Sequence, residues 1–137
     1  MAAQPRTSNN DRGVVVTHIP LVVVVEDDAG SRRSLARVLR AGGFEPATYA
    51  SAEEFLAAPP AHLPVGMLLD VRLPALSGLD LQKQLRREGS TIPIIIMTAL
   101  EDAASREEAE RYGCLAYLNK PCDGDRILTL LQGLVDR

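Results

Sequence analysis

The sequence predicts an α/β fold in which helices cover both faces of a doubly wound, five-stranded parallel sheet, giving three layers. From Pro20 onward, short β-branched apolar runs alternate with five amphipathic stretches, as strands alternate with crossover helices. The first run, Leu21 to Val25, is continuously apolar, which is typical of a strand buried on both faces. Hydrophobic residues form 46% of the chain but aromatic residues only 4%, so we expect an aliphatic core.

The first half of this alternation carries clear end signals. A helix is expected over residues 30–40, because its apolar residues recur at helical spacing and Gly42 and Gly43 follow it. A weaker strand over 44–49 precedes a short helix, which begins where Ser51 and Glu54 can form a capping box.

The second half repeats the pattern. The third strand, residues 65–69, runs directly into Asp70, and a helix follows the turn at Ser77 and Gly78. The fourth strand, residues 92–97, ends at Thr98. A highly charged stretch over 102–112 predicts a solvated helix with one narrow apolar face, and a last strand over 114–118 precedes a closing helix from about Gly124.

Composition and charge exclude several classes of protein. A net charge of −3 offers no general basic field for nucleic acid. The apolar run over 14–25 is interrupted by polar residues and is shorter than the roughly 20 residues that span a bilayer, so we expect no membrane segment. The polar start of the chain argues against a signal peptide, and Cys114 and Cys122 are expected to be reduced thiols in a cytoplasmic protein. We expect a disordered tail over 1–19 and one folded domain over 20–137.

Unusual polar residues follow four of the five expected strands. Ligands bind outside the carboxyl ends of parallel strands, so these side chains are expected to meet in one crevice. They are Glu26, Asp27 and Asp28 after the first strand, Asp70 after the third, Thr98 after the fourth and Lys120 after the fifth.

The chemistry of this set suggests a metal-assisted phosphoryl transfer. Clustered carboxylates without nearby His or Cys suit Mg²⁺ better than zinc. Lys120, the Thr98 hydroxyl and the Ala99 amide can meet phosphoryl oxygens, and an aspartate can accept a phosphoryl group as an acyl phosphate. Taken singly, Asp27 and Asp70 are more simply explained as caps or loop carboxylates, and Asp28 as the cap of the first helix.

Four blocks occur in order along the chain: Val24-Val-Glu-Asp-Asp28, Asp70-Val-Arg-Leu-Pro74 with Ser77-Gly78, Met97-Thr-Ala99 and Tyr117-Leu-Asn-Lys-Pro121. They resemble the signature blocks of two-component response regulator receiver domains, which are CheY-like, and the resemblance covers about residues 21–134. Tyr49-Ala-Ser-Ala-Glu-Glu-Phe-Leu56 and the Leu73-Pro-Ala-Leu-Ser-Gly-Leu79 turn further resemble the FixJ-type branch. The resemblance implies a flavodoxin-like sheet with strand order 2-1-3-4-5.

The resemblance also implies roles for individual residues. Asp70 would be the phosphoacceptor, and Thr98, Lys120 and the Ala99 amide would contact the phosphoryl group. Magnesium, or manganese in its place, would be bound by Asp27, Asp70 and the backbone carbonyl of Arg72, with Glu26 acting through water; no other cofactor is expected. Lys120-Pro121 would be a cis peptide, and Thr98 and Tyr117 would form the switch.

The function implied is that of a signalling module rather than a turnover enzyme. A sensor histidine kinase or phosphotransfer protein would donate the phosphoryl group. The surface formed by the 102–112 helix, the 114–118 strand and the closing helix would change, and it could also mediate a dimer. The output would be a separate protein effector or a domain beyond Arg137.

Two alternatives remain open. One is a phosphorylation-independent adaptor with the same fold. The other is an aspartyl-nucleophile phosphatase of the haloacid dehalogenase type, against which Arg72 counts because such enzymes need a second Asp at that position.

Overall fold

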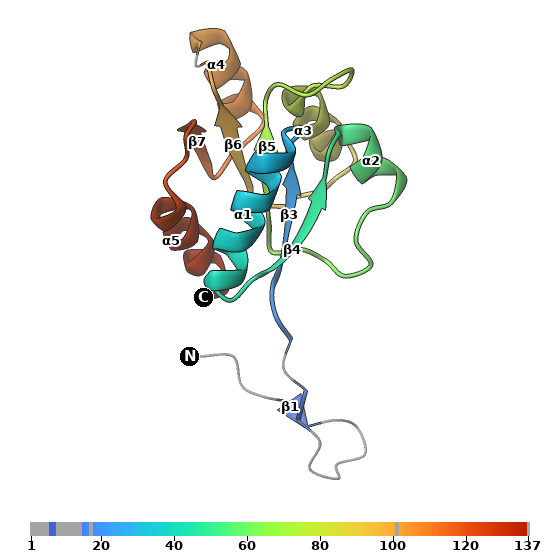
Figure 1. Cartoon of the computed structure of the whole chain (residues 1–137). Coiled ribbons are helices and arrows are strands. Elements are labelled where there is room, and N and C mark those ends of the chain that lie inside the picture. Colours follow the sequence, from blue (N-terminus) through green and yellow to red (C-terminus); the bar gives the residue numbers. More distant parts are fainter. Residues whose placement is uncertain (1–5, 8–14, 17, 101, 137) are drawn as a thin grey trace.

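The computed structural model describes residues 6–7, 15–16, 18–100 and 102–136, and it confirms the predicted fold class. A parallel sheet with strand order β4-β3-β5-β6-β7 lies between two layers of helices (Figure 1). In chain order this is the expected order 2-1-3-4-5. The strands are β3 (Leu21–Val25), β4 (Glu45–Tyr49), β5 (Gly66–Asp70), β6 (Ile94–Thr98) and β7 (Ala116–Asn119). The helices that follow them are α1 (Ala29–Ala41), α2 (Ala52–Ala57), α3 (Gly78–Arg87), α4 (Ala103–Arg111) and α5 (Gly124–Val135).

The segment before β3 contributes one short pairing to the described residues. β1 (Arg6–Thr7) and β2 (Val15–Val16) pair antiparallel. The expected disorder over 1–19 falls mainly on residues 1–5, 8–14 and 17, which lie outside the described residues. Among the helices that the structure describes, none is long and apolar enough to cross a bilayer.

The core lies on both faces of the sheet because successive strand residues point to opposite sides. Val22 and Val24 of β3 pack with buried residues of α1 and α5, whereas Val23 and Val25 pack with those of α2, α3 and α4. All four valine side chains are fully buried, as the continuous apolar run predicted. Figure 1 shows α1 and α5 together on one side of the sheet.

Side-chain caps explain where three helices begin. Asp28 accepts from the Ser31 amide at 2.8 Å and caps α1, as expected. The Ser51 hydroxyl accepts from the Glu54 amide at the start of α2. At the start of α3, Ser77 and Asp80 form a reciprocal capping box that places the helix directly after the loop from Asp70.

The end of α4 is anchored to α3 by two long polar side chains. Gln82 is fully buried and donates to the Ala109 carbonyl at 2.9 Å. The Arg86 guanidinium donates to four backbone carbonyls in the loops that follow α3 and α4, those of Ser90, Ile92, Tyr112 and Gly113. Apart from Ala109, α4 buries no residue, so these bonds do much to fix its position.

Candidate functional site

The predicted polar residues meet at the carboxyl edge of the sheet. The register pairs Asp70 with Met97 and Thr98 with Asn119, so β5, β6 and β7 end side by side. Glu26 continues from β3, and its amide still donates to the Tyr49 carbonyl at 3.0 Å. Four strands therefore deliver their last residues to one place.

Lys120 joins the two buried carboxylates of this edge. Its Nζ donates to Glu26 Oε1 at 2.6 Å and to Asp70 Oδ2 at 2.8 Å. Glu26 is 1% and Asp70 3% exposed, so both carboxylates are almost completely shielded from solvent. The Lys120 amide also donates to the Thr98 carbonyl at 2.7 Å, and the Lys120-Pro121 peptide is cis, as expected.

The charge state of Lys120 follows from these partners. Burial alone would lower its pKa, because a charged ammonium loses solvation. The hydrogen bonds and charges of Asp70 and Glu26 outweigh that effect and raise the pKa above its usual 10.5. The side chain is therefore a fixed positive charge at neutral pH.

Asp27 completes a group of three carboxylates. One oxygen each of Glu26, Asp27 and Asp70 lies within 4.8 Å of the others, and Asp27 is the exposed member. Hard oxygen donors on the solvent side of a buried acid pair suit a small divalent cation. The donor set therefore fits Mg²⁺ or Mn²⁺. The ligand role of the Arg72 carbonyl stays a prediction; the Arg72 amide donates to Asp70 Oδ1 at 3.1 Å.

Thr98 is at the predicted edge, but its hydroxyl is engaged elsewhere. It donates to the Leu100 carbonyl at 3.0 Å and accepts from the Leu100 amide at 3.2 Å. Thr98 is buried, whereas Leu100 is 61% exposed. The hydroxyl can reach a group on Asp70 only by leaving this local loop.

Tyr117 lies inward, with 8% of its surface exposed. The Arg106 guanidinium of α4 covers its ring at 5.0 Å from the ring centroid, so the expected switch aromatic already touches the helix that it would influence.

Two contacts at the site involve residues to which the sequence analysis assigns no role. Arg32 of α1 donates from Nη1 to the backbone carbonyls of Glu26 and Asp27. Gly78 packs its Cα against the Asp70 backbone so closely that a side chain has no room. An arginine in the first turn after an acidic loop, and a glycine as the first helical residue, are the only signals that the sequence carries for them.

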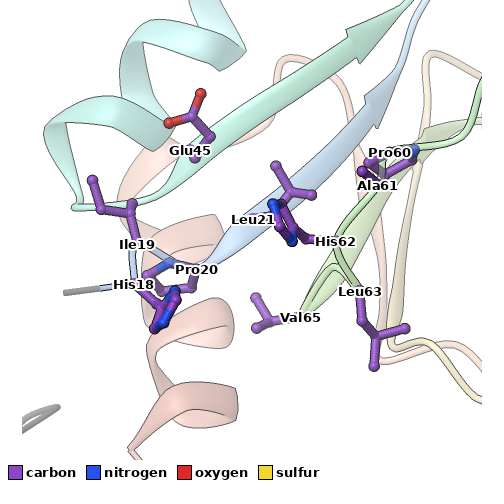
Figure 2. A pocket seen from close by; sticks show the side chains of 10 residues that line it. All are labelled: His18, Ile19, Pro20, Leu21, Glu45, Pro60, Ala61, His62, Leu63 and Val65. Carbon is purple, nitrogen blue, oxygen red and sulfur yellow. The ribbon is translucent and has the colours of Figure 1, made fainter. Parts of the chain in front are cut away.

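Two pockets of similar volume lie at opposite edges of the sheet, and only one of them adjoins the acidic site. A pocket of about 640 Å³ opens beside Glu26 and Lys120 and is lined also by Ser31, Ser34 and Leu35 of α1. A slightly larger one, about 700 Å³, lies at the opposite, amino edge of the sheet, where Figure 2 shows His18 and His62 beside Leu21 and Val65. Both histidines are thus remote from Asp70.

Comparison with known proteins identifies the family. Residues 22–132 match the family described as response regulator receiver domain. The chain belongs to this family. Receiver domains are signalling domains of two-component systems, and the predicted resemblance is confirmed.

Individual relatives agree with that assignment. The receiver domain is 38% identical over 117 residues to Nodulation protein W of Bradyrhizobium diazoefficiens, covering 85% of this chain and 52% of that protein. It is 35% identical to the Transcriptional regulatory protein FixJ of the same organism, covering 83% of this chain and 56% of that protein. The chain thus spans about half the length of these relatives. A solved response regulator receiver protein from Pseudomonas putida is 29% identical, with a TM-score of 0.78, covering 86% of this chain and 99% of that one.

Proposed function

We propose that this receiver domain accepts a phosphoryl group on Asp70 and passes the signal on by changing a protein-binding surface. One observation carries the proposal: Lys120 binds Asp70 and Glu26 together at the strand edge, beside the exposed carboxylate of Asp27. A fixed ammonium against an aspartate in a cation-binding acidic group is the arrangement that phosphoryl transfer to a carboxylate needs.

The transfer step is a displacement at phosphorus. A carboxylate oxygen of Asp70 attacks, an O–P bond forms, and the N–P bond to a donor phosphohistidine breaks, with the imidazole nitrogen keeping the bonding electron pair. Lys120 faces the transferred oxygens with its positive charge. A hollow opens beside Glu26 and Lys120, and Lys120 is the residue that binds Asp70.

The acidic group would hold the divalent cation. Glu26, Asp27, Asp70 and the Arg72 carbonyl are the proposed ligands, with Glu26 acting through water. When bound, Mg²⁺ or Mn²⁺ supplies positive charge that stabilises the oxygens of the transferred group. Lys120 and the amide of Asp28 hold the Glu26 carboxylate, so this acid stays in place before any cation binds.

The conformational output runs through Thr98 and Tyr117. A phosphoryl group on Asp70 offers the Thr98 hydroxyl and the Ala99 amide a stronger acceptor than the Leu100 carbonyl. Release of Leu100 alters the loop before α4, and the Tyr117 ring under Arg106 responds. The surface formed by α4, β7 and α5 then changes shape, and its affinity for partner proteins changes with it. The same surface could also form a dimer.

The proposed partners follow from this chemistry. A sensor histidine kinase or phosphotransfer protein, acting in the cytoplasm, would donate the phosphoryl group. The signal would pass to a separate effector protein or to an output domain beyond Arg137. No contact with nucleic acid by the receiver domain itself is proposed, and it would not turn over external substrates.

The test is intact-mass measurement after incubation with Mg²⁺ and acetyl phosphate. The wild type should gain one phosphoryl group, and EDTA or Asp70→Asn should abolish the gain. A wild type without gain, or an equal gain in Asp70→Asn, contradicts the proposal. Unchanged partner binding on phosphorylation would favour the adaptor, and continuous hydrolysis of phosphomonoesters would favour the phosphatase.

A further inference from the structure

The loop between β3 and α1 carries two of the three acids, and its backbone depends on one side chain. The Glu26 amide is the last group of this segment that bonds to a neighbouring strand, so the carbonyls of Glu26 and Asp27 have no strand partner. The Arg32 Nη1 atom donates to the Glu26 carbonyl at 2.9 Å and to the Asp27 carbonyl at 3.1 Å. Within the described residues, neither carbonyl accepts another hydrogen bond.

The three acids differ in how their side chains are held. Glu26 is bound by Lys120 and the Asp28 amide, and Asp70 by Lys120 and the Arg72 amide. The Asp27 carboxylate is exposed and has no hydrogen-bond partner in the described part of the chain. Its position is therefore set by the backbone of its own loop, which Arg32 holds.

We propose that Arg32 is the positioning residue of the cation site: by bridging two successive carbonyls it holds Asp27 where its carboxylate can bind a divalent cation. This inference rests on the proposed function. The planar guanidinium on its long stem can present one nitrogen to both carbonyls while Arg32 remains part of α1. The mobile ammonium of a lysine replaces this arrangement poorly.

The sign of the effect separates positioning from simple electrostatics. Arg32 carries a positive charge beside an acidic group, so loss of that charge alone strengthens cation binding. Loss of positioning weakens it, because the Asp27 ligand is no longer fixed. Residues that orient metal ligands typically contribute about 10- to 100-fold to metal affinity.

The neighbouring Arg33 supplies a matched control. It carries the same charge one residue further along α1, is exposed, and makes no hydrogen bond or ion pair within the described residues. Arg33→Gln removes one positive charge near the acids and breaks no contact to the loop.

The experiment measures Mg²⁺ and Mn²⁺ affinity by calorimetry for the full chain. We expect Arg32→Gln to bind about tenfold more weakly than wild type, and Arg32→Lys to fall in between. We expect Arg33→Gln to bind equally or slightly more tightly. Affinity in Arg32→Gln equal to or above that of Arg33→Gln overturns the inference.

A second measurement needs no metal. The Asp28 amide, which donates to Glu26 Oε2 in this loop, should exchange its proton faster in Arg32→Gln than in wild type, as followed by NMR without divalent cations. Unchanged exchange overturns the positioning role, and Arg32→Lys provides the comparison if Arg32→Gln does not fold.

Failure of the inference and failure of the proposed function give different results. If all variants take up phosphoryl on Asp70 with equal Mg²⁺ affinity, the positioning role is wrong and the function stands. If Arg32→Gln weakens Mg²⁺ binding but wild-type Asp70 is never phosphorylated, the proposed function is wrong and the positioning role stands.

Discussion

The packing of Gly78 against the Asp70 end of β5 predicts a large effect of one methyl group. A Cβ built at Gly78 lies 2.0 Å from the backbone oxygen and 2.8 Å from the backbone carbon of Asp70. Non-bonded carbon contacts are ordinarily about 3.5–4.0 Å. The neighbours are backbone atoms, which cannot rotate away as a side chain could. Gly78→Ala must therefore separate α3 from the end of β5 by about 1 Å or more.

The cost can be estimated from overpacking. Extra carbon atoms in a well-packed site typically cost about 1–3 kcal/mol and occasionally more, and two backbone contacts place this substitution near about 3 kcal/mol. The helix preference for alanine over glycine returns at most about 1 kcal/mol. We therefore expect a net loss of about 2–3 kcal/mol. With a urea slope of about 2 kcal/mol per molar, the unfolding midpoint falls by about 1–1.5 M.

Gly133→Ala is the matched control. Gly133 lies within α5, and a Cβ there meets no atom of the described residues within 4 Å. The same substitution should stabilise the protein by about 0.5–1 kcal/mol, because alanine is the better helix residue. Urea unfolding of both variants, followed by circular dichroism, compares them. The reasoning is refuted if Gly78→Ala is as stable as Gly133→Ala.

Three further predictions concern the site and its supports. Lys120→Met leaves the buried carboxylates of Glu26 and Asp70 without their shared cation, and should lower the free energy of unfolding by about 3 kcal/mol in the absence of metal. Urea unfolding measures this loss, and added Mg²⁺ should restore part of it. Unchanged stability without metal argues against the stabilising role of the Lys120 ion pairs. Arg86→Met removes four hydrogen bonds to backbone carbonyls and should lower the free energy of unfolding by about 3 kcal/mol. Amide hydrogen exchange should become faster at the end of α4. Exchange that becomes equally faster in α5 argues against a local anchor. Burial raises the pKa of Cys114 above its usual 9.0, so the folded state favours the neutral thiol. The shift therefore contributes to the free energy of unfolding below pH 9.0, and this contribution is lost as the pH rises through the raised pKa. Iodoacetamide should accordingly modify Cys114 more slowly in the native protein at mildly alkaline pH than in urea, and equal rates would contradict this.

The fold could be predicted because it rests on patterns that repeat along the chain. The continuous run of β3 and the helical spacing in α1 report burial directly. The ends of the strands differ from the prediction: β6 begins at Ile94, two residues later than predicted, and β7 at Ala116 rather than Cys114. Element ends depend on local hydrogen bonds rather than on periodicity.

The acidic edge could be predicted for a different reason. Parallel strands bring their carboxyl ends together, so residues that follow β3, β5 and β7 must be neighbours once the fold is known. The contact of Lys120 with Glu26 and Asp70 confirms that residues at the ends of these three strands meet at one edge of the sheet.

The supports of the site could not be predicted. Arg32, Gln82 and Arg86 act by donating to backbone carbonyls, which every residue carries, so no residue type marks the acceptor. The engagement of Thr98 with Leu100 likewise depends on the path of one loop. Contacts of this kind appear only when the chain is placed in three dimensions.

The most direct test of the central claim is the chemical identity of the phosphorylated residue. Borohydride reduction after phosphorylation converts an acyl-phosphorylated aspartate to homoserine, which marks its position. The tryptic peptide over residues 41–72 contains Asp70 as its only aspartate, so a mark on aspartate in that peptide identifies it. We predict that homoserine appears at position 70 alone, and only when Mg²⁺ and acetyl phosphate are both present. A mark at Asp27, or phosphate that stays on a histidine or serine, would contradict the account.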